Sequence, residues 1–368
     1  MKFSCLQENL SKGLQTVMHA VPAKSSLPIL SNVLIETEKG RIKLSATNLE
    51  TAVTTYVGAS IEEDGSITIP ARLLKDFITN LSPGTINAQV KNDIFLINSK
   101  STKSKFNGSS PKDFPELPEF PKKAKSLNIE PSLLNEVIGV VAFASGLDTS
   151  RPIFTGIYMD YSKDKLVVTS TDGFRLSEKT VKIKGSTDDF KVVIPAKTLV
   201  EVSKIFSSSQ ESIEFALDQN ENLALFKSED TLIATRILDG DYPDYKKIIP
   251  SEHILTATFD TLLFTEAVKL TDIFAKEGNS TIKIRFDPEG KIKITSLSEE
   301  TGQHESNLEA EIEGELLEIA FNSRYLLDFL NNIKSEKIDF NSNGNVSPCV
   351  FKPDSQKNFV HIIMPMQM

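Results

Sequence analysis

The chain has 368 residues, 39% of them hydrophobic and 25% charged, and its formal net charge at pH 7 is −9. That length and apolar content suffice for two or three domains with buried cores, and the longest nearly unbroken apolar run, residues 137–147, is too short to cross a bilayer. The negative net charge argues against a general nucleic-acid-binding surface, which is usually basic.

The N-terminal residues favour a cytoplasmic protein. Met1 to Cys5 are followed by polar residues, and this stretch lacks the apolar core of a signal peptide. The two cysteines, Cys5 and Cys349, are too few for a disulfide framework. Because both lie in strand-like runs, we predict two buried thiols.

The first part of the chain alternates between helical and strand patterns. Apolar residues at helical spacing predict a helix over about Gln7 to Val21, and residues 42–47 alternate apolar and polar, as a half-buried strand does. Pro70 then ends a strand, and a second amphipathic helix follows it. The order is strand, helix, several strands, helix, several strands, which indicates an α+β fold.

This pattern occurs three times along the chain. The recurring elements are the opening helix (7–21, 131–144, 261–275), a first strand (32–35, 156–159, 281–284), an alternating strand (42–47, 166–171, 292–297), and a strand end with the second helix (69–77, 194–202, 321–329). For the last of these elements the copies lie 125 and 127 residues apart. An offset so nearly constant predicts three similar domains, each with two helices and antiparallel sheets.

Two stretches mark the junctions between the copies. Residues 113–121 are rich in proline, which neither a helix nor a central strand accommodates, and residues 241–250 have a similar character. These junctions predict domains at 1–121, 126–250 and 254–368.

Sequence motifs for catalysis or metal binding are absent. The chain has no phosphate-binding or dinucleotide-binding glycine loop, no zinc pattern and no serine nucleophile elbow. The best candidate metal loop begins at Asp239, but it lacks the glycine and the glutamate of a calcium-binding loop. We therefore predict no catalytic residue, no metal and no cofactor; an enzyme with a scattered site is the alternative.

Three similar domains in a row indicate a repeated interface. Domains joined head to tail either close into a ring or run on into a filament. The six predicted helices carry a net charge of about +2 and the rest of the chain about −11. That division fits helices that line a hole and contact phosphates weakly, without reading sequence, although ordinary solvated helix faces would give the same count.

Seven short stretches are the most specific motifs of the chain. They are Leu27–Asn32, Thr47–Glu50, Ile69–Arg72, Asp113–Pro115, Thr171–Leu176, Leu238–Tyr245 and Met364–Met366. With them the chain resembles, from end to end, the beta subunits of bacterial DNA polymerase III, the family of bacterial sliding clamps. The resemblance implies a homodimeric ring of six domains, with sheets outside and helices inside. Such a ring encircles double-stranded DNA independently of sequence and tethers the replicative polymerase to it.

The same resemblance implies partners and a binding pocket. The partners would be the DNA polymerase III alpha subunit, the ATP-dependent clamp loader and other proteins with a clamp-binding peptide motif; a membrane is not among them. The peptide pocket carries over to Phe154, Thr171, Gly173, Phe174, Arg175, Leu176, Pro243, Lys247, Ile248, Ile362, Ile363, Met364, Pro365 and Met366. Apolar and Met side chains would give an adaptable groove for varied peptides.

Two further sets of residues carry over from the family. The DNA-facing cations are Lys24 and Arg151, although Pro152 and Ile153 stand where aromatic residues are common in the family. The ring-closing interface is formed by Leu73, Phe77 and Phe106 of one chain and by Ile273 and Phe274 of the other. The main rival to the clamp is a protein-interaction scaffold that binds peptides but does not encircle DNA.

Overall fold

The computed structural model describes residues 1–100, 102–121, 125–185, 188–218, 220–276, 279–298 and 302–367. The chain forms two compact units. Unit 1 comprises Met1–Ser132, Gly185–Thr187 and Glu201–Ile237, and unit 2 comprises Leu133–Lys184, Asp188–Val200 and Leu238–Met368. The central repeat is therefore divided between the two units.

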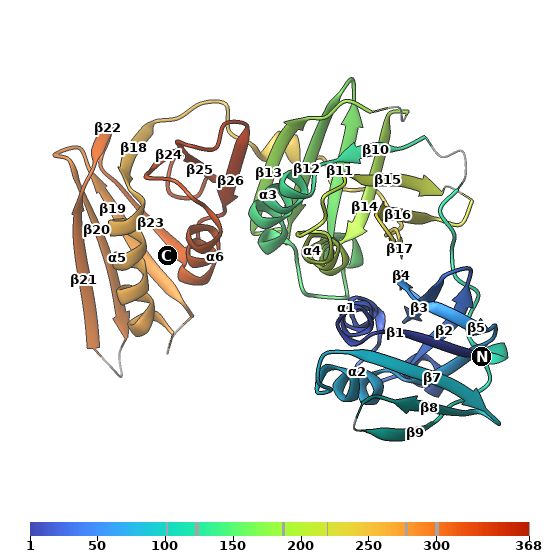
Figure 1. The fold of residues 1–368 in the computed structure, drawn as a ribbon. Coiled ribbons are helices and arrows are strands. Elements are labelled where there is room, and N and C mark those ends of the chain that lie inside the picture. Colours follow the sequence, from blue (N-terminus) through green and yellow to red (C-terminus); the bar gives the residue numbers. More distant parts are fainter. Residues whose placement is uncertain are drawn as a thin grey trace. The chain divides into compact units, whose positions relative to one another are not determined.

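The predicted pattern of three repeats is confirmed, because each begins with a strand and contains two α-helices (Figure 1). The helices are α1 (Gln7–Val17), α2 (Ala71–Thr79), α3 (Pro131–Val141), α4 (Ala196–Ile205), α5 (Thr261–Ala275) and α6 (Ser323–Asn332). The short 3-10 helices are η1 (Met18–Ala20), η2 (Pro28–Ser31), η3 (Pro111–Asp113), η4 (Ala142–Ala144), η5 (Pro152–Thr155) and η6 (Tyr245–Ile248). The first and second opening helices end as α-helix earlier than predicted, since η1 and η4 form their last turns.

Unit 1 contains two antiparallel sheets. The smaller has the order β5 (Ser60–Glu63), β1 (Lys2–Leu6), β7 (Thr85–Lys91), β8 (Ile94–Asn98) and β9 (Lys103–Asn107). The larger has the order β10 (Leu127–Ile129), β15 (Ile213–Asp218), β16 (Leu223–Ser228), β17 (Thr231–Arg236), β4 (Thr51–Gly58), β3 (Arg41–Thr47), β2 (Asn32–Glu38) and β6 (Ser66–Pro70). Pairing of β4 with β17 joins the first repeat to the second.

Unit 2 repeats this arrangement. Its larger sheet has the order β14 (Phe190–Pro195), β11 (Gly156–Ser162), β12 (Lys165–Thr171), β13 (Arg175–Lys182), β26 (Phe359–Ile363), β25 (Cys349–Pro353), β24 (Lys337–Ser342), β18 (Leu255–Asp260) and β22 (Glu311–Gly314). The smaller has the order β21 (Gly302–Glu309), β20 (Lys291–Ser298), β19 (Thr281–Asp287) and β23 (Leu317–Asn322). Pairing of β13 with β26 joins the second repeat to the third.

The helices bury their apolar faces on these sheets. In unit 1, α1 lies beside α2 (Figure 1) and buries Leu10, Leu14 and Val17. Gly13 allows its close approach, because a Cβ atom there would lie 2.6 Å from Cγ2 of Val57 on β4. Helix α5 begins at Thr261, and the Asp260 carboxylate accepts a hydrogen bond from Leu263 N, which caps the helix.

The core of the third repeat is dominated by stacked phenylalanines. The rings of Phe286 and Phe340 stack with centroids 4.4 Å apart, and Phe351 meets Phe340 edge-on at 5.1 Å. The two thiols are buried as predicted, and burial raises the pKa of both Cys5 and Cys349 to about 12. Among the residues that the structure describes, the helices are all too short or too polar to cross a membrane.

Candidate functional site

A small apolar cavity of about 160 Å³ lies at the junction of the second and third repeats, within unit 2. Its walls come from η5, from the end of β12 and the start of β13, from the segment around η6, and from the chain after β26. The lining residues are Phe154, Thr171, Gly173, Phe174, Arg175, Leu176, Pro243, Asp244, Tyr245, Ile248, Ile362 and Met364. Segments far apart in the sequence thus meet at one place.

A tight turn between β12 and β13 forms one wall. The Asp172 carboxylate accepts hydrogen bonds from Phe174 N and Arg175 N, at 2.9 and 3.0 Å. Gly173 has a φ of +93°, in the region that favours glycine. The turn leaves 61% of the Phe174 side chain exposed. An apolar ring is therefore held at the mouth of the cavity by a fixed backbone.

The Arg175 side chain is only 9% exposed, and its charge is compensated inside unit 2. Its Nε lies 3.0 Å from Oδ2 of Asp172, and its Nη1 lies 2.5 Å from Oδ2 of Asp328 on α6. The guanidinium also lies 4.7 Å from the ring centroid of Tyr325, within the range of a cation–π contact. With its charge satisfied, Arg175 gives the cavity a wall and leaves it suited to an apolar ligand.

Tyrosines fix the opposite wall. The Tyr245 hydroxyl donates to Oε2 of Glu178 at 2.5 Å and accepts from Oγ1 of Thr169 at 3.0 Å. The Tyr242 ring stacks on the Tyr158 ring, with centroids 4.8 Å apart. Burial raises the pKa of Tyr242 and Tyr245 well above the usual range, so both hydroxyls stay protonated at neutral pH.

The C-terminal residues complete the cavity. Met364 N donates to the carbonyl of Phe174 at 2.8 Å, which places the Met364 side chain beside the turn. Two residues later, Met366 N donates to the carbonyl of Ala320 at 2.8 Å, and the Met366 sulfur accepts from the Thr281 hydroxyl at 3.4 Å. The tail is thus bonded on both sides of Pro365.

Most residues that the sequence assigned to the pocket line this cavity. The exceptions are Lys247, Ile363, Pro365 and Met366. Lys247 is largely exposed and forms an ion pair with Asp244 at 2.8 Å, whereas Ile363 is buried in β26. Asp244 and Tyr245, which also line the cavity, were missed, although both stand in the YPDY motif that the sequence singled out.

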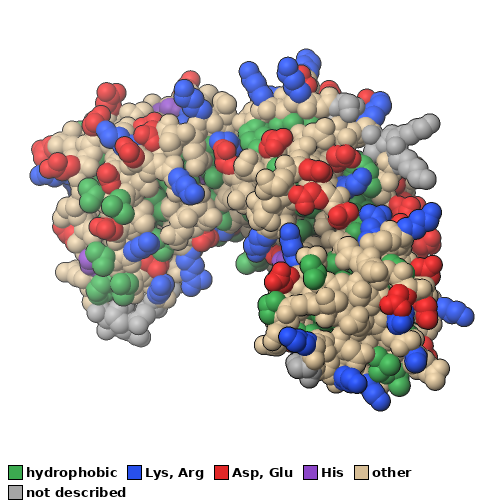
Figure 2. Space-filling view, viewed as in Figure 1, with side chains coloured by type: hydrophobic (Ala, Val, Ile, Leu, Met, Phe, Trp, Pro, Cys, Tyr) green, Lys and Arg blue, Asp and Glu red, His purple; other side chains and the backbone are tan. Residues whose placement is uncertain are grey.

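The two residues assigned to DNA are exposed cations in loops. Lys24 lies between η1 and η2 in unit 1, and Arg151 directly precedes η5 in unit 2. Neither forms an ion pair among the described residues. Figure 2 shows acidic and basic side chains interspersed over the visible face, so the net charge of −9 does not exclude local basic patches.

The residues assigned to ring closure form two apolar patches, in which Leu73 and Ile273 are exposed and Phe106 is buried. In unit 1, Leu73 on α2 is 58% exposed, and the ring of Phe77 meets that of Phe106 on β9 at 5.1 Å. In unit 2, Ile273 on α5 is 61% exposed, and the ring of Phe274 stacks on His304 of β21 at 5.4 Å. Each patch thus combines a helix with an edge strand of a sheet.

Comparison with known proteins gives one consistent result. Family models for the N-terminal, central and C-terminal domains of the DNA polymerase III beta subunit match residues 1–118, 128–244 and 246–367. The chain is 30% identical to the beta sliding clamp of Synechocystis sp. and 28% identical to that of Bacillus subtilis, with 100% of both chains covered in each case.

Solved structures agree with these relatives. The DNA polymerase sliding clamp from Bacillus subtilis superimposes with a TM-score of 0.95 at 28% identity, covering 100% of this chain and 99% of that one. A sliding clamp from Pseudomonas aeruginosa bound to griselimycin superimposes with a TM-score of 0.93 at 27% identity, covering 100% of both chains.

Proposed function

Since the chain belongs to the family of DNA polymerase III beta subunits, whose members act as sliding clamps and not as enzymes, we propose that two copies close head to tail around duplex DNA and hold partner proteins through the cavity of unit 2. The observation that carries this proposal is the repetition of one sheet junction. The strands β4 and β13, each the third after an opening helix, pair with β17 and β26, each the last of its repeat.

The same rule predicts the junction that would close the ring. The third strand after the opening helix of the third repeat is β21, and the last strand of the first repeat is β9. Both lie at the edges of their sheets. Pairing β21 of one copy with β9 of the other repeats the two observed junctions, and two such pairings close a ring of six domains.

Side chains support this pairing. The edge strand β9 presents the exposed cations Lys103 and Lys105, whereas β21 presents the exposed carboxylates Glu309 and Glu305, the latter paired with Lys293 at 2.6 Å. Opposite charges steer two surfaces together and suppress the wrong pairings. The apolar patches around Leu73 and Ile273 would be covered in the same contact, which accounts for the exposure of these two side chains in the single chain.

A charge placed in an apolar patch tests the ring. For Leu73→Glu combined with Ile273→Glu, we expect a particle of 40.7 kDa in light scattering, against twice that mass for the unaltered protein. Val346→Glu, at another exposed apolar residue, should leave the dimer intact. A double variant that still runs as a dimer would refute the proposed interface.

Encirclement makes a separate prediction for DNA. Lys24 and Arg151 would contact phosphates, which hold the clamp weakly and allow it to slide. After loading by a clamp loader, the protein should stay on nicked circular DNA and be lost when the circle is linearised. Equal retention on both forms would favour the alternative, a scaffold that does not encircle DNA.

The cavity of unit 2 would bind the partner peptides. We propose the DNA polymerase III alpha subunit, the clamp loader and other proteins with the clamp-binding motif as its partners, acting in the cytoplasm. The cavity is apolar and is edged by Phe174 and Met364, and the family resemblance supports a peptide as its ligand. The domain bounds 1–121, 126–250 and 254–368 remain part of this proposal, supported by the segments that the family models match.

Truncation tests the pocket. Deleting residues 364–368 removes the Met364 wall. We therefore expect it to abolish the binding, in fluorescence anisotropy, of a labelled peptide with a Leu-Phe pair, two apolar residues chosen to suit the apolar cavity. The dimer should persist, because the deleted residues belong to neither apolar patch. Unchanged peptide affinity would refute the pocket assignment.

A further inference from the structure

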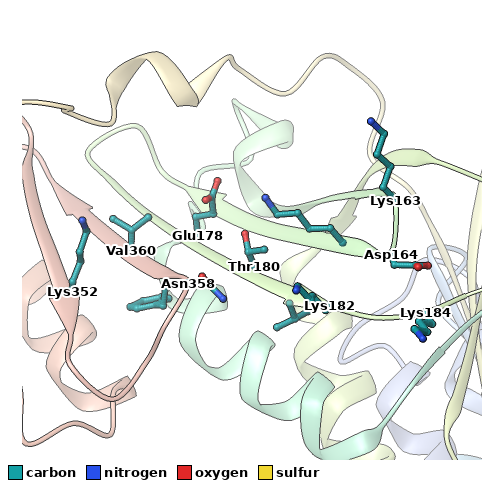
Figure 3. A pocket seen from close by; sticks show the side chains of 12 residues that line it. Lys163, Asp164, Glu178, Thr180, Lys182, Lys184, Lys352, Asn358 and Val360 are labelled. Atoms are coloured by element: carbon teal, nitrogen blue, oxygen red, sulfur yellow. The ribbon is translucent and has the colours of Figure 1, made fainter.

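A second hollow, of about 1060 Å³, lies along the same two strands as the apolar cavity, within unit 2 (Figure 3). Five lysines line it: Lys163, Lys165, Lys182, Lys184 and Lys352. They come from the β11–β12 turn and the start of β12, from the end of β13 with the residues after it, and from β25. Figure 2 shows basic side chains gathered over the ends of β12 and β13. We call this region the lysine hollow.

The lysine hollow has an excess of positive charge, since five lysines share it with two carboxylates. Among the residues that the structure describes, none of the five lysines takes part in an ion pair. The two carboxylates of the hollow offset only part of this charge; Glu178 accepts from the Tyr245 hydroxyl at 2.5 Å, and Asp164 accepts from the Tyr161 hydroxyl at 3.3 Å. In a chain with a net charge of −9, unpaired lysines that face one concavity attract an anionic ligand.

The hollow and the apolar cavity share their strands. On β13, Leu176 lines the apolar cavity, and Glu178, Thr180 and Lys182 line the hollow at alternate positions. On β26, Ile362 lines the cavity and Val360 lines the hollow. Alternate residues of a strand face the same side, so Leu176 and Lys182 lie about 20 Å apart along one face. An extended segment of about six residues spans that distance.

We propose that the lysine hollow binds an acidic stretch of the same partner chain whose apolar anchor fills the cavity, with the acidic residues about four to six positions away from the anchor. This inference rests on the proposed function of the cavity. The shared strands favour a continuous polypeptide as the occupant, because one extended chain can reach both sites. Each exposed ion pair is weak and screened by salt, so the lysines would act together to choose among partners.

Three peptides with the same Leu-Phe anchor test the proposal. The first carries three glutamates, the second three glutamines and the third three lysines, at four to six positions from the anchor. Each peptide is made in two versions, with this flank before or after the anchor. At low salt we expect the glutamate flank, on one of the two sides, to bind about ten-fold more tightly than the glutamine flank in fluorescence anisotropy. The lysine flank should bind more weakly, and 0.5 M salt should remove most of the difference.

Charge removal supplies the matched controls. Lys182→Gln combined with Lys352→Gln should abolish the preference for glutamate and leave the affinity of the glutamine-flanked peptide unchanged. Lys283→Gln, at an exposed lysine of β19 outside the hollow, should leave the preference intact. These substitutions are all at exposed positions, so the variants should remain folded.

The outcomes separate this inference from the proposed function. Equal affinity of the glutamate and glutamine flanks would overturn the lysine hollow as a peptide site while the cavity stands. Failure of every anchor peptide to bind would overturn both. A labelled single-stranded oligonucleotide that binds the unaltered protein but not the double lysine variant, without any preference for glutamate, would overturn the proposal in favour of a nucleic-acid site.

Discussion

The two junctions between repeats share a backbone plan but differ in their side chains. At the first, β4 meets β17 through hydroxyl pairs, Thr55 with Thr231 at 2.8 Å and Thr51 with Thr235 at 3.4 Å. At the second, β13 meets β26 through a buried Ser177–His361 hydrogen bond of 2.8 Å, beside Arg175. The same strand pairing thus supports a polar contact in unit 1 and an apolar cavity in unit 2. The two junctions have the same strand pairing, so the difference between them comes from the side chains.

The linkers between the repeats, which contain Phe120 in unit 1 and Tyr245 in unit 2, differ in the same way. In unit 1, the half-buried Phe120 lies 5.5 Å from the Lys227 ammonium, over a polar hollow of about 460 Å³. In unit 2, Tyr245 is buried in a cluster with Leu176, Val350 and Ile362. A buried apolar cluster makes the wall of the second junction rigid, which lowers the cost of ordering it around a ligand.

The largest difference between the junctions should appear when an arginine is removed from each. Arg175→Ala leaves Asp172 and Asp328 without their cation, so we expect a loss of about 3 kcal/mol in the free energy of unfolding of unit 2. Arg41→Ala at the first junction removes exposed ion pairs and should cost less than about 1 kcal/mol. Denaturant titration followed by hydrogen exchange in each unit measures both losses. Equal losses in the free energy of unfolding for the two variants would contradict the proposed difference between the junctions.

A smaller effect is expected from removing a tyrosine hydroxyl. Tyr245→Phe breaks the bonds to Glu178 and Thr169, at a cost of about 1.5 kcal/mol, and should weaken binding of the anchor peptide several-fold. Tyr56→Phe on β4 is the matched control, because its hydroxyl makes no hydrogen bond among the described residues. Calorimetric melting and anisotropy together test the pair, and a peptide affinity insensitive to Tyr245→Phe would show that this wall is not needed.

Acid should affect the second junction more than the first. Burial, with a further contribution from the Arg175 charge, lowers the pKa of His361 well below its usual value. The folded state therefore favours the neutral imidazole, whereas the unfolded state takes up a proton near the ordinary histidine pKa of about 6.5. The contribution of His361 to the stability of unit 2 is complete above that pH and declines as the pH falls below it. Between pH 7.5 and 5.5 unit 2 should lose about 1.4 kcal/mol. His361→Gln should remove that pH dependence, and a variant that keeps it would point to other groups.

The smallest effect should come from the threonine pair of the first junction. Replacing both Thr55 and Thr231 by valine removes a hydroxyl pair while leaving no unsatisfied partner, so the free energy of unfolding should change by less than about 0.5 kcal/mol. The affinity of the anchor peptide should not change. A large loss in the free energy of unfolding, measured by denaturant titration, would show that the first junction depends on this hydroxyl pair.

The sequence pattern predicted the repeats and the helices, and the family resemblance named most of the residues that line the cavity. Periodic apolar positions located α1 and α5, and the motifs around Gly173 and Met364 marked two walls of the cavity. The lysine hollow was not predicted, since Lys163, Lys182 and Lys352 come from separate strands and turns and carry no motif. The division of the central repeat was missed too, because continuous sheets across the junctions cannot be read from spacing.

The edge strands β9 and β21 have a consequence for the chain before it assembles. An unpaired edge offers free backbone groups to any other extended segment and is a common starting point for aggregation. Here Lys103 and Lys105 on one edge and Glu305 and Glu309 on the other would repel a like edge and accept only the opposite one. The charges that would select the neighbour in the proposed ring would therefore also protect newly made chains from pairing with one another in the wrong register.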